Sequence, residues 1–227
     1  KVMALKYGTQ EDLQTWINLM GHVSGQTQRA EAIINWHQSK LASLREDLSR
    51  LPQTEKPKII YFNRFADQLV VAGRDTYNDF YIQLVGGINP AHSQFSGFLE
   101  VNEEQILLWD PDIILIGNFD RATPDDVYKR PLWQSVSAVK NRRVYKIPLG
   151  GYRWDPPNQE SPLMWQWLAM VAHPDRVSFD LHNQMKEAYR MLYGYELTDE
   201  DIASILQADL NRGAAYYDRF LPREGGQ

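Results

Sequence analysis

The sequence predicts an α/β fold: a Rossmann-like three-layer lobe with a mostly parallel sheet, preceded by a long inter-lobe α-helix. Three segments are predicted to be strands, and the one at 113–116 is apolar without alternation, which is typical of a strand that is covered on both faces. They are KIIYF at 58–62, IILI at 113–116 and RVYKI at 143–147. The second observation is that helical patterns lie between these segments, and parallel strands require such crossovers. The third is an apolar stripe at helical spacing over Gln28–Leu51.

Composition fits a globular protein and narrows the function classes. The chain has 227 residues, 43% of them hydrophobic and 23% charged, and a formal net charge of −5. No basic run appears, so no nucleic-acid partner is expected. Cysteine is absent, which excludes disulfides and thiolate chemistry. No apolar run reaches the length of about 18 residues that a membrane span needs, and no signal peptide is visible.

The first 25 residues hold one predicted strand and one predicted helix. Val2–Tyr7 is a strand pattern that lacks neighbouring partners, so we expect the natural chain to begin earlier. Thr9 is a suitable N-cap for a helix over Glu11–Met20. Gly21 and Gly25 predict a break after this helix.

Gln28–Leu51 predicts the longest helix, because no Gly or Pro interrupts it before Pro52. A helix of roughly 24 residues is about 36 Å long. It is either an amphipathic surface helix or a rigid strut between two lobes. His37 lies on its apolar stripe, where a packed histidine is more common than a ligand. The polar segment Pro52–Pro57 is the best domain boundary.

The second part of the chain begins with the strand Lys58–Phe62 and a loop at Asn63–Asp67. Leu69–Gly73 predicts a short strand that folds back. Thr76 is placed to cap a helix that runs to Val85. Asn89–Gly97 is polar and rich in turn residues.

Val101–Gly117 predicts a short helix, a stop and a buried strand. Asn102 is the N-cap and Gln105 has capping-box spacing. Pro111 ends the helix, and the strand 113–116 follows. Further helices are predicted at Thr123-Pro124, Pro131–Val139, Leu163–Ala172 (capped by Ser161 and opened by Pro162), Phe179–Tyr193, Thr198–Leu206 and Asn211–Phe220.

Three loops follow the three buried strands, at 63–67, 117–120 and 149–159. If the strands are parallel, these loops share one edge of the sheet, where ligands of open α/β sheets bind. Arginine offers a fixed fork of donors for carboxylates or other oxyanions, and Tyr and Trp offer flat walls. The candidate ligand-binding residues are Tyr152, Arg153, Trp154, Asn118, Phe119, Arg64, Phe65 and Arg74.

A structural role is the alternative for part of this set, with Trp154 in the core and Arg153 paired with Asp155. No catalytic constellation accompanies the candidates. The sequence has neither a phosphate-binding glycine loop nor a Gly-x-Ser-x-Gly elbow, and its five histidines lack metal-ligand spacing. Asp110 and Asp112 are expected to be turn and cap residues. We therefore expect binding rather than catalysis, with no resident metal or cofactor.

The order of these motifs resembles a known family. The long helix is followed by KIIYF, LVVAG, VGGIN, EVNEEQILLWDPDIILIG, PLWQSVSAVKNRRVYKIP and GGYRWDPPNQESPLMWQWLAMVAHPD. This series resembles the solute-binding proteins of ABC importers for siderophores, haem, cobalamin and related metal chelates. The closest group has a long helix between its lobes. The resemblance covers nearly the whole chain.

The resemblance implies two α/β lobes that hold a metal chelate or an oxyanion in a cleft between them. Residues 1–25 would be a remnant of the N-terminal lobe, 26–53 the connecting helix and 56–227 the C-terminal lobe. Little lobe closure is expected across a stiff helix. In this family an acidic residue on each lobe commonly docks onto a membrane permease, and Glu160 lies near that place. The full-length protein is expected to be a monomer in the periplasm or at the extracellular face.

Two other functions remain open from the residues alone. One is an α/β enzyme of chelatase-like or transferase type that uses His92 or His173. The other is a receptor-like module that binds only a protein partner.

Overall fold

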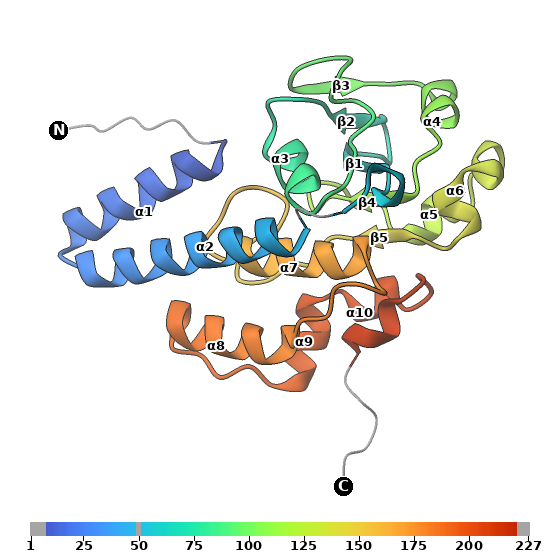
Figure 1. Ribbon diagram of the computed structural model, residues 1–227. Helices are drawn as coiled ribbons and strands as arrows, with labels where there is room; N and C mark the ends of the chain where they lie inside the picture. Colours follow the sequence, from blue (N-terminus) through green and yellow to red (C-terminus); the bar gives the residue numbers. More distant parts are fainter. Residues whose placement is uncertain (1–7, 49–50, 222–227) are drawn as a thin grey trace, which may run out of the picture.

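The computed structural model describes residues 8–48 and 51–221 (Figure 1). Its helices are α1 (Gln10–Ser24), α2 (Thr27–Leu48), α3 (Tyr77–Leu84), α4 (Glu103–Trp109), α5 (Pro124–Tyr128), α6 (Ser137–Lys140), α7 (Ser161–Ala172), α8 (Leu181–Tyr193), α9 (Asp199–Ile205) and α10 (Ala208–Asn211). Its 3-10 helices are η1 (Gln53–Glu55), η2 (Pro131–Ser135) and η3 (Tyr217–Phe220). Its strands are β1 (Ile59–Arg64), β2 (Val70–Ala72), β3 (Phe98–Glu100), β4 (Ile113–Ile116) and β5 (Val144–Lys146). None of these helices combines the length and apolar character that a membrane crossing needs.

α1 and α2 form an antiparallel hairpin that extends away from the sheet (Figure 1). Thr9 caps α1 with a complete capping box, as predicted, and Gly25 ends it in the left-handed conformation. The predicted break at Gly21 is wrong. Gly21 continues α1 because it packs against Ala30 of α2, where any side chain would collide. The predicted strand Val2–Tyr7 lies outside the described residues.

The sheet has five strands in the order β3-β2-β1-β4-β5. The three strands predicted as buried, β1, β4 and β5, are parallel, and β2 and β3 add an antiparallel edge. The returning strand after β1 is therefore confirmed, and β3 is a strand that the sequence pattern missed. β1 also continues to Arg64, so the predicted loop starts two residues too early.

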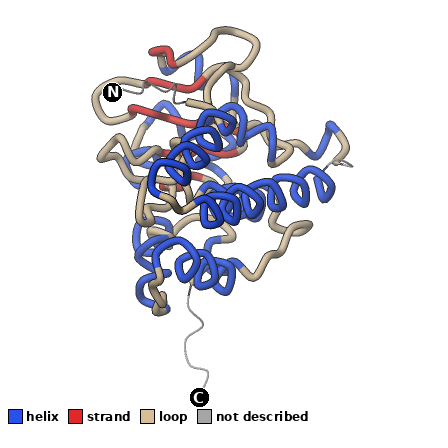
Figure 2. Tube along the Cα trace, turned by 90° about the vertical axis from the view of Figure 1, so that its left-hand side faces the viewer, coloured by secondary structure: helices blue, strands red, loops and turns tan. Residues whose placement is uncertain are grey.

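Helices cover both faces of the sheet and make three layers, as predicted (Figure 2). Alternate residues of β1 and β4 face opposite layers because successive side chains in a strand point to opposite faces. Ile59, Tyr61, Ile113 and Leu115 pack with α3, α7 and α8, and Ile60, Phe62, Ile114 and Ile116 pack with α4, η2 and α6. α7 is buried along its whole length, which explains its apolar sequence.

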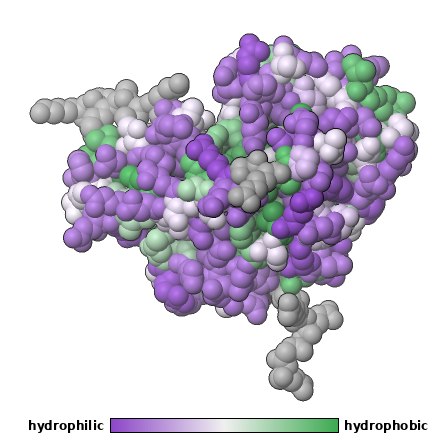
Figure 3. Space-filling model, viewed as in Figure 1, coloured by the Kyte–Doolittle hydropathy of each residue, from purple (hydrophilic) through white to green (hydrophobic). Residues whose placement is uncertain are grey.

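The two edges of the sheet end differently. At β5, the Asn211 side chain accepts a hydrogen bond from the Lys146 N–H at 2.7 Å and donates to the Lys146 carbonyl at 2.9 Å. This amide takes the place of a neighbouring strand. At the other edge, no described strand pairs with the outer side of β3, and Phe98 and Leu99 are about half exposed. The space-filling view shows a hydrophobic patch near α4 (Figure 3).

Several predicted helices differ in detail. Asn102 caps α4 by accepting from the Gln105 N–H, but the reciprocal half of a capping box is absent from its cap. The predicted helix Pro131–Val139 is divided at Val136 into η2 and α6. The predicted final helix is two short pieces, α10 and η3. The N-cap of α7 is Glu160, and Ser161 is its first helical residue.

Candidate functional site

The exits of the three parallel strands converge, as the sequence predicted. Asp155 joins them, because its Oδ2 accepts from the Tyr61 hydroxyl at 2.8 Å and from the Asn118 N–H at 2.9 Å. The Asn118 side chain in turn donates to the Pro148 carbonyl at 2.9 Å. The ends of β1, β4 and β5 therefore form one surface, which we call the carboxyl edge.

Two arginines share one aromatic ring on this carboxyl edge. The guanidinium carbon of Arg153 lies 4.8 Å from the centroid of the Phe119 ring, and that of Arg64 lies 6.0 Å from it. Arg153 also donates to the Asn118 carbonyl at 3.3 Å, and Arg64 donates to the Phe119 carbonyl. Tyr152 lies next to Arg153 and is 43% exposed. We call Arg64, Phe119, Tyr152 and Arg153 the arginine cluster.

The charges of the arginine cluster are available to a ligand. Neither Arg64 nor Arg153 forms an ion pair with a carboxylate of the described residues. Both contact Phe119, which is 41% exposed. Guanidinium groups that lack acidic partners and lie on an aromatic ring are suited to binding an anion by paired hydrogen bonds. The alternative in which Arg153 pairs with Asp155 is not what the structure shows.

Buried groups hold the backbone beneath the arginine cluster. Lys146 donates its Nζ protons to the carbonyls of Gly117, Asp120 and Ala122 at 3.0, 2.7 and 3.0 Å. Burial lowers the pKa of Lys146, and the nearby Asp120 acts against that shift. Asp120 accepts from the N–H of Phe65 at 2.7 Å. Despite partial burial, such backbone hydrogen bonds lower the pKa of Asp120. The loop after β4 is thus fixed by these charged groups.

Besides Asn118, whose side chain is bound to the Pro148 carbonyl beside the cluster, three predicted ligand-binding residues are not in the arginine cluster. Trp154 is fully buried and donates its indole N–H to Glu160 at 2.7 Å, so it belongs to the core. Phe65 is 2% exposed and packs edge-to-face on Trp133. Arg74 lies 3.7 Å from Asp75 in an exposed ion pair. Assigning the first two to a ligand surface is wrong because their side chains do not reach it.

Glu160 is also misplaced by the sequence prediction. It is fully buried, and its carboxyl oxygens accept from Trp154, from the Tyr189 hydroxyl at 2.8 Å and from the Tyr193 hydroxyl. Gly150 passes directly over it, where a Cβ atom would collide with the Glu160 carboxyl group. Glu160 therefore anchors the 149–159 loop and does not offer a surface for permease docking.

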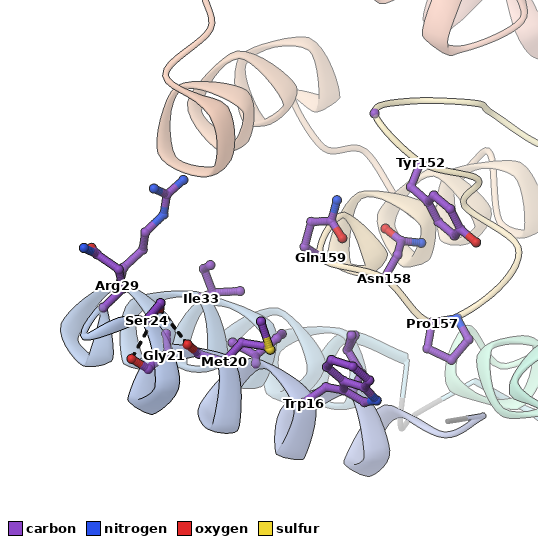
Figure 4. Close-up of a pocket in the computed structure, with 15 residues that line it drawn as sticks. Trp16, Met20, Gly21, Ser24, Arg29, Ile33, Tyr152, Pro157, Asn158 and Gln159 are labelled. Carbon is purple, nitrogen blue, oxygen red and sulfur yellow. Dashed lines mark hydrogen bonds between the residues drawn. The ribbon is translucent and has the colours of Figure 1, made fainter. Parts of the chain in front are cut away.

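A wide groove lies beside the arginine cluster, between the α1–α2 hairpin and the 149–159 loop (Figure 4). Its volume of about 910 Å³ is at the upper end of the range for small-molecule sites. Trp16 and Met20 line it from α1, and Tyr152 and Gln159 line it from the loop. Tyr152 is the residue that the groove shares with the arginine cluster.

The sequence analysis did not assign the α1 side of this groove to a site. Trp16 is 37% exposed and Met20 is 48% exposed. Their four-residue spacing places both on one helix face, and this apolar face was the available signal. Without the position of the loop, it could not be distinguished from an ordinary core face.

His37, His92 and His173 have structural partners. His37 is fully buried, as predicted for a packed histidine. His173 is buried and lies 2.7 Å from the Val85 carbonyl through its Nε2. His92 contacts Asp79 at 2.8 Å. The described residues contain no cluster of three or more potential metal ligands of the His, Cys, Asp or Glu type. This arrangement gives no support to an enzyme that uses His92 or His173.

Comparison with known proteins gives the same picture. The family model described as "Periplasmic binding protein" matches residues 1–149. The molybdate-binding protein MolA of Haemophilus influenzae is 22% identical over 185 residues, which are 81% of this chain and 52% of MolA. The Fe(3+)-citrate-binding protein YfmC of Bacillus subtilis is 31% identical over 98 residues, which are 43% of this chain and 31% of YfmC. The chain thus spans about half the length, or less, of these curated relatives.

Solved structures agree with the fold. A periplasmic solute-binding protein from Veillonella parvula is 39% identical with a TM-score of 0.85, over 92% of this chain and 64% of that one. An ABC transporter solute-binding protein from Sulfurospirillum deleyianum is 26% identical with a TM-score of 0.73, over 87% of this chain and 62% of that one. These matches are to solute-binding proteins rather than to enzymes.

Proposed function

Since the chain belongs to the periplasmic binding protein family, we propose that it is the C-terminal lobe and connecting helix of an ABC-importer receptor for an anionic ligand. Residues 56–227 form the ligand-binding lobe, 26–53 the connecting helix and 1–25 part of the first lobe. The ligand is an oxyanion or a metal chelate that carries carboxylates. It lies between the lobes and is delivered to a membrane permease.

The observation that carries this proposal is the arginine cluster. It presents two guanidinium groups that have no acidic partner among the described residues, at the edge where ligands of open α/β sheets bind. The names of two relatives support an anion, since molybdate is an oxyanion and citrate is a carboxylate that chelates iron. In this role Arg64 and Arg153 bind the charged oxygens. Phe119 and Tyr152 supply flat surfaces beside them.

The transport setting is proposed from the same family membership. The receptor works as a monomer in the periplasm or on the extracellular face, and it passes its cargo to the permease. The buried Glu160 is excluded from that contact by its position. The groove beside the 149–159 loop gives the ligand room to extend beyond the arginine cluster.

The test is titration calorimetry of the two-lobed protein with molybdate and with ferric citrate. We expect Arg153→Ala and Arg64→Ala each to weaken binding of the preferred probe by about ten-fold or more, because each removes charged hydrogen bonds. Arg121→Ala is the matched control. Arg121 is exposed and directly follows the 117–120 loop, but it pairs with Asp67 at 3.6 Å. Unchanged affinity in both cluster variants would overturn the proposed site.

A further inference from the structure

His37 connects three separate elements through its two ring nitrogens. Its Nδ1 lies 2.9 Å from the Gln10 side-chain nitrogen of α1, and its Nε2 lies 3.0 Å from the Gln159 carbonyl of the 149–159 loop. The ring itself belongs to α2 and is fully buried. One side chain thus bridges both helices of the hairpin to the loop on the other side of the groove.

The hydrogen bonds fix the form of the ring. The Gln10 amide nitrogen can only donate, so Nδ1 must accept, and Nε2 carries the proton that is donated to Gln159. Burial lowers the pKa of His37 from 6.5 to about 4, although the bond to Gln159 acts in the opposite direction. The ring is therefore neutral at pH 7. Trp36 and Trp165 hold it edge-to-face, with centroids 5.3 and 5.9 Å away.

The bond to Gln159 continues toward the arginine cluster along the loop. Next to Gln159, the Asn158 side chain donates to the Arg153 carbonyl at 2.8 Å and to the Pro156 carbonyl at 2.8 Å. Asn158 also accepts from the Glu160 N–H at 2.7 Å. The stretch held by His37 is thus the same compact turn that holds the backbone of Arg153.

We propose that His37 is a positioning residue for ligand binding: through its bond to Gln159 it holds the 149–159 loop at a fixed distance from the α1–α2 hairpin. This places Tyr152 and Arg153 for the ligand and sets the width of the groove. The inference rests on the proposed function for its effect on affinity. Its effect on the loop is independent of any ligand.

A role in packing alone would also explain a buried histidine. The test must therefore distinguish the hydrogen bond at Nδ1 of His37 from the one at Nε2. A Gln at position 37 brings an amide nitrogen to the place of Nε2, whereas the shorter Asn brings an amide oxygen to the place of Nδ1. His37→Gln therefore keeps the donor to Gln159, and His37→Asn keeps only the acceptor for Gln10. Both variants replace the ring by a smaller amide, which makes them a matched pair.

The experiment measures both variants in the two-lobed protein. Hydrogen exchange reports on the loop amides of Gly151, Asn158 and Glu160, and calorimetry uses the molybdate and ferric citrate probes. In His37→Asn we expect faster exchange at these amides and about ten-fold weaker binding of the preferred probe. In His37→Gln we expect exchange like that of the parent and affinity within about two-fold.

Equal behaviour of the two variants would overturn the proposal, because a packing role does not distinguish the nitrogens. If the parent binds neither probe, the proposed anion chemistry fails, and the exchange measurement still decides whether His37 holds the loop. If a variant does not fold, Gln10→Leu replaces it, since that change removes the donor to Nδ1 and leaves the ring in place. Because Gln10→Leu keeps the Nε2 bond to Gln159, loop exchange like that of the parent supports the connection, and faster exchange assigns the loop position to packing of the hairpin and refutes it.

Discussion

The two halves of the 149–159 loop, with Glu160 at its end, differ sharply. In the first half, Leu149 and Tyr152 are each 43% exposed, and Arg153 reaches out to Phe119. In the second half, Trp154 is fully buried and Glu160 binds it from the α7 cap. The comparison teaches that this loop is a rigid base that presents a few free side chains. Such preorganisation lowers the conformational cost of binding a ligand.

In the buried half, the carboxylate of Glu160 accepts hydrogen bonds from three side-chain donors. Burial, and next the charge of Glu160, raise the pKa of Tyr189 and of Tyr193, so both hydroxyls keep their protons and donate. The exposed half has no comparable network among the described residues. We therefore expect substitutions that disturb the buried Glu160 network to affect stability, and substitutions of the exposed side chains to affect ligand binding.

The largest stability loss is expected for Glu160→Ala. It leaves the buried Trp154 indole and Tyr189 hydroxyl, and the partly exposed Tyr193 hydroxyl, without their acceptor. Unsatisfied buried donors of this kind add up to about 4 kcal/mol. Urea unfolding measures the loss, with the exposed Glu187→Ala of α8 as control. A loss below about 1 kcal/mol would show that the two halves do not differ as described.

The next effect is a loss in the free energy of unfolding at acid pH, which comes from His37. Its pKa is about 4 in the folded chain, because of burial, and 6.5 as the ordinary value. As the pH falls through this interval, the unfolded chain binds a proton that the folded chain does not. The free energy of unfolding therefore decreases by about 3 kcal/mol between pH 6.5 and pH 4.

Urea titrations at about pH 7 and about pH 4 measure this loss. His37→Gln is the comparison, because it lacks the titrating ring and should lose that much less stability on acidification. The same pH slope in parent and variant would assign the acid sensitivity to other groups.

Gly150→Ala tests how closely the first half of the loop packs on the buried anchor in the second half. The added Cβ would collide with the Glu160 carboxyl group and lie 2.8 Å from the Trp154 indole nitrogen. We expect a loss of about 2 kcal/mol, since overpacking forces the anchor to shift. Gly213→Ala is the matched control, because its Cβ would meet only the end of the Arg142 side chain. Thermal unfolding of both variants checks the difference, and equal stability would contradict it.

The smallest effect on stability is expected for Arg153→Ala in the exposed half. Its guanidinium lies on Phe119 and has no described ion pair to lose. The free energy of unfolding should change by no more than about 0.5 kcal/mol, measured by urea unfolding. A loss of several kcal/mol would mean that Arg153 belongs to the anchor and not to a free binding surface.

The sequence predicted the sheet well because its signals are local. An unbroken apolar run marks β4, segments rich in apolar residues mark β1 and β5, and Thr9, Thr76 and Asn102 mark helix starts by their own side chains. Parallel strands then require their exits to meet at one edge. That geometric rule was enough to bring Asn118 close to Arg153.

The failures concern contacts that no local pattern marks. Trp154 follows Arg153 directly, but Trp154 packs in the core and donates to Glu160, whereas Arg153 lies on Phe119. Gly21 stays helical because Ala30 packs against it. Phe65 is drawn into the core by Trp133. None of these contacts has a periodic signal, so a pattern of residue types cannot reveal them.

The two edges of the sheet differ, and this difference limits how copies of this chain can associate by strand pairing. The Asn211 amide already occupies the main-chain groups of Lys146 on β5, whereas β3 leaves its outer main chain unmatched among the described strands. Two molecules that joined through β3 would leave no second edge free among the described strands. Strand pairing from this sheet would therefore stop at a pair.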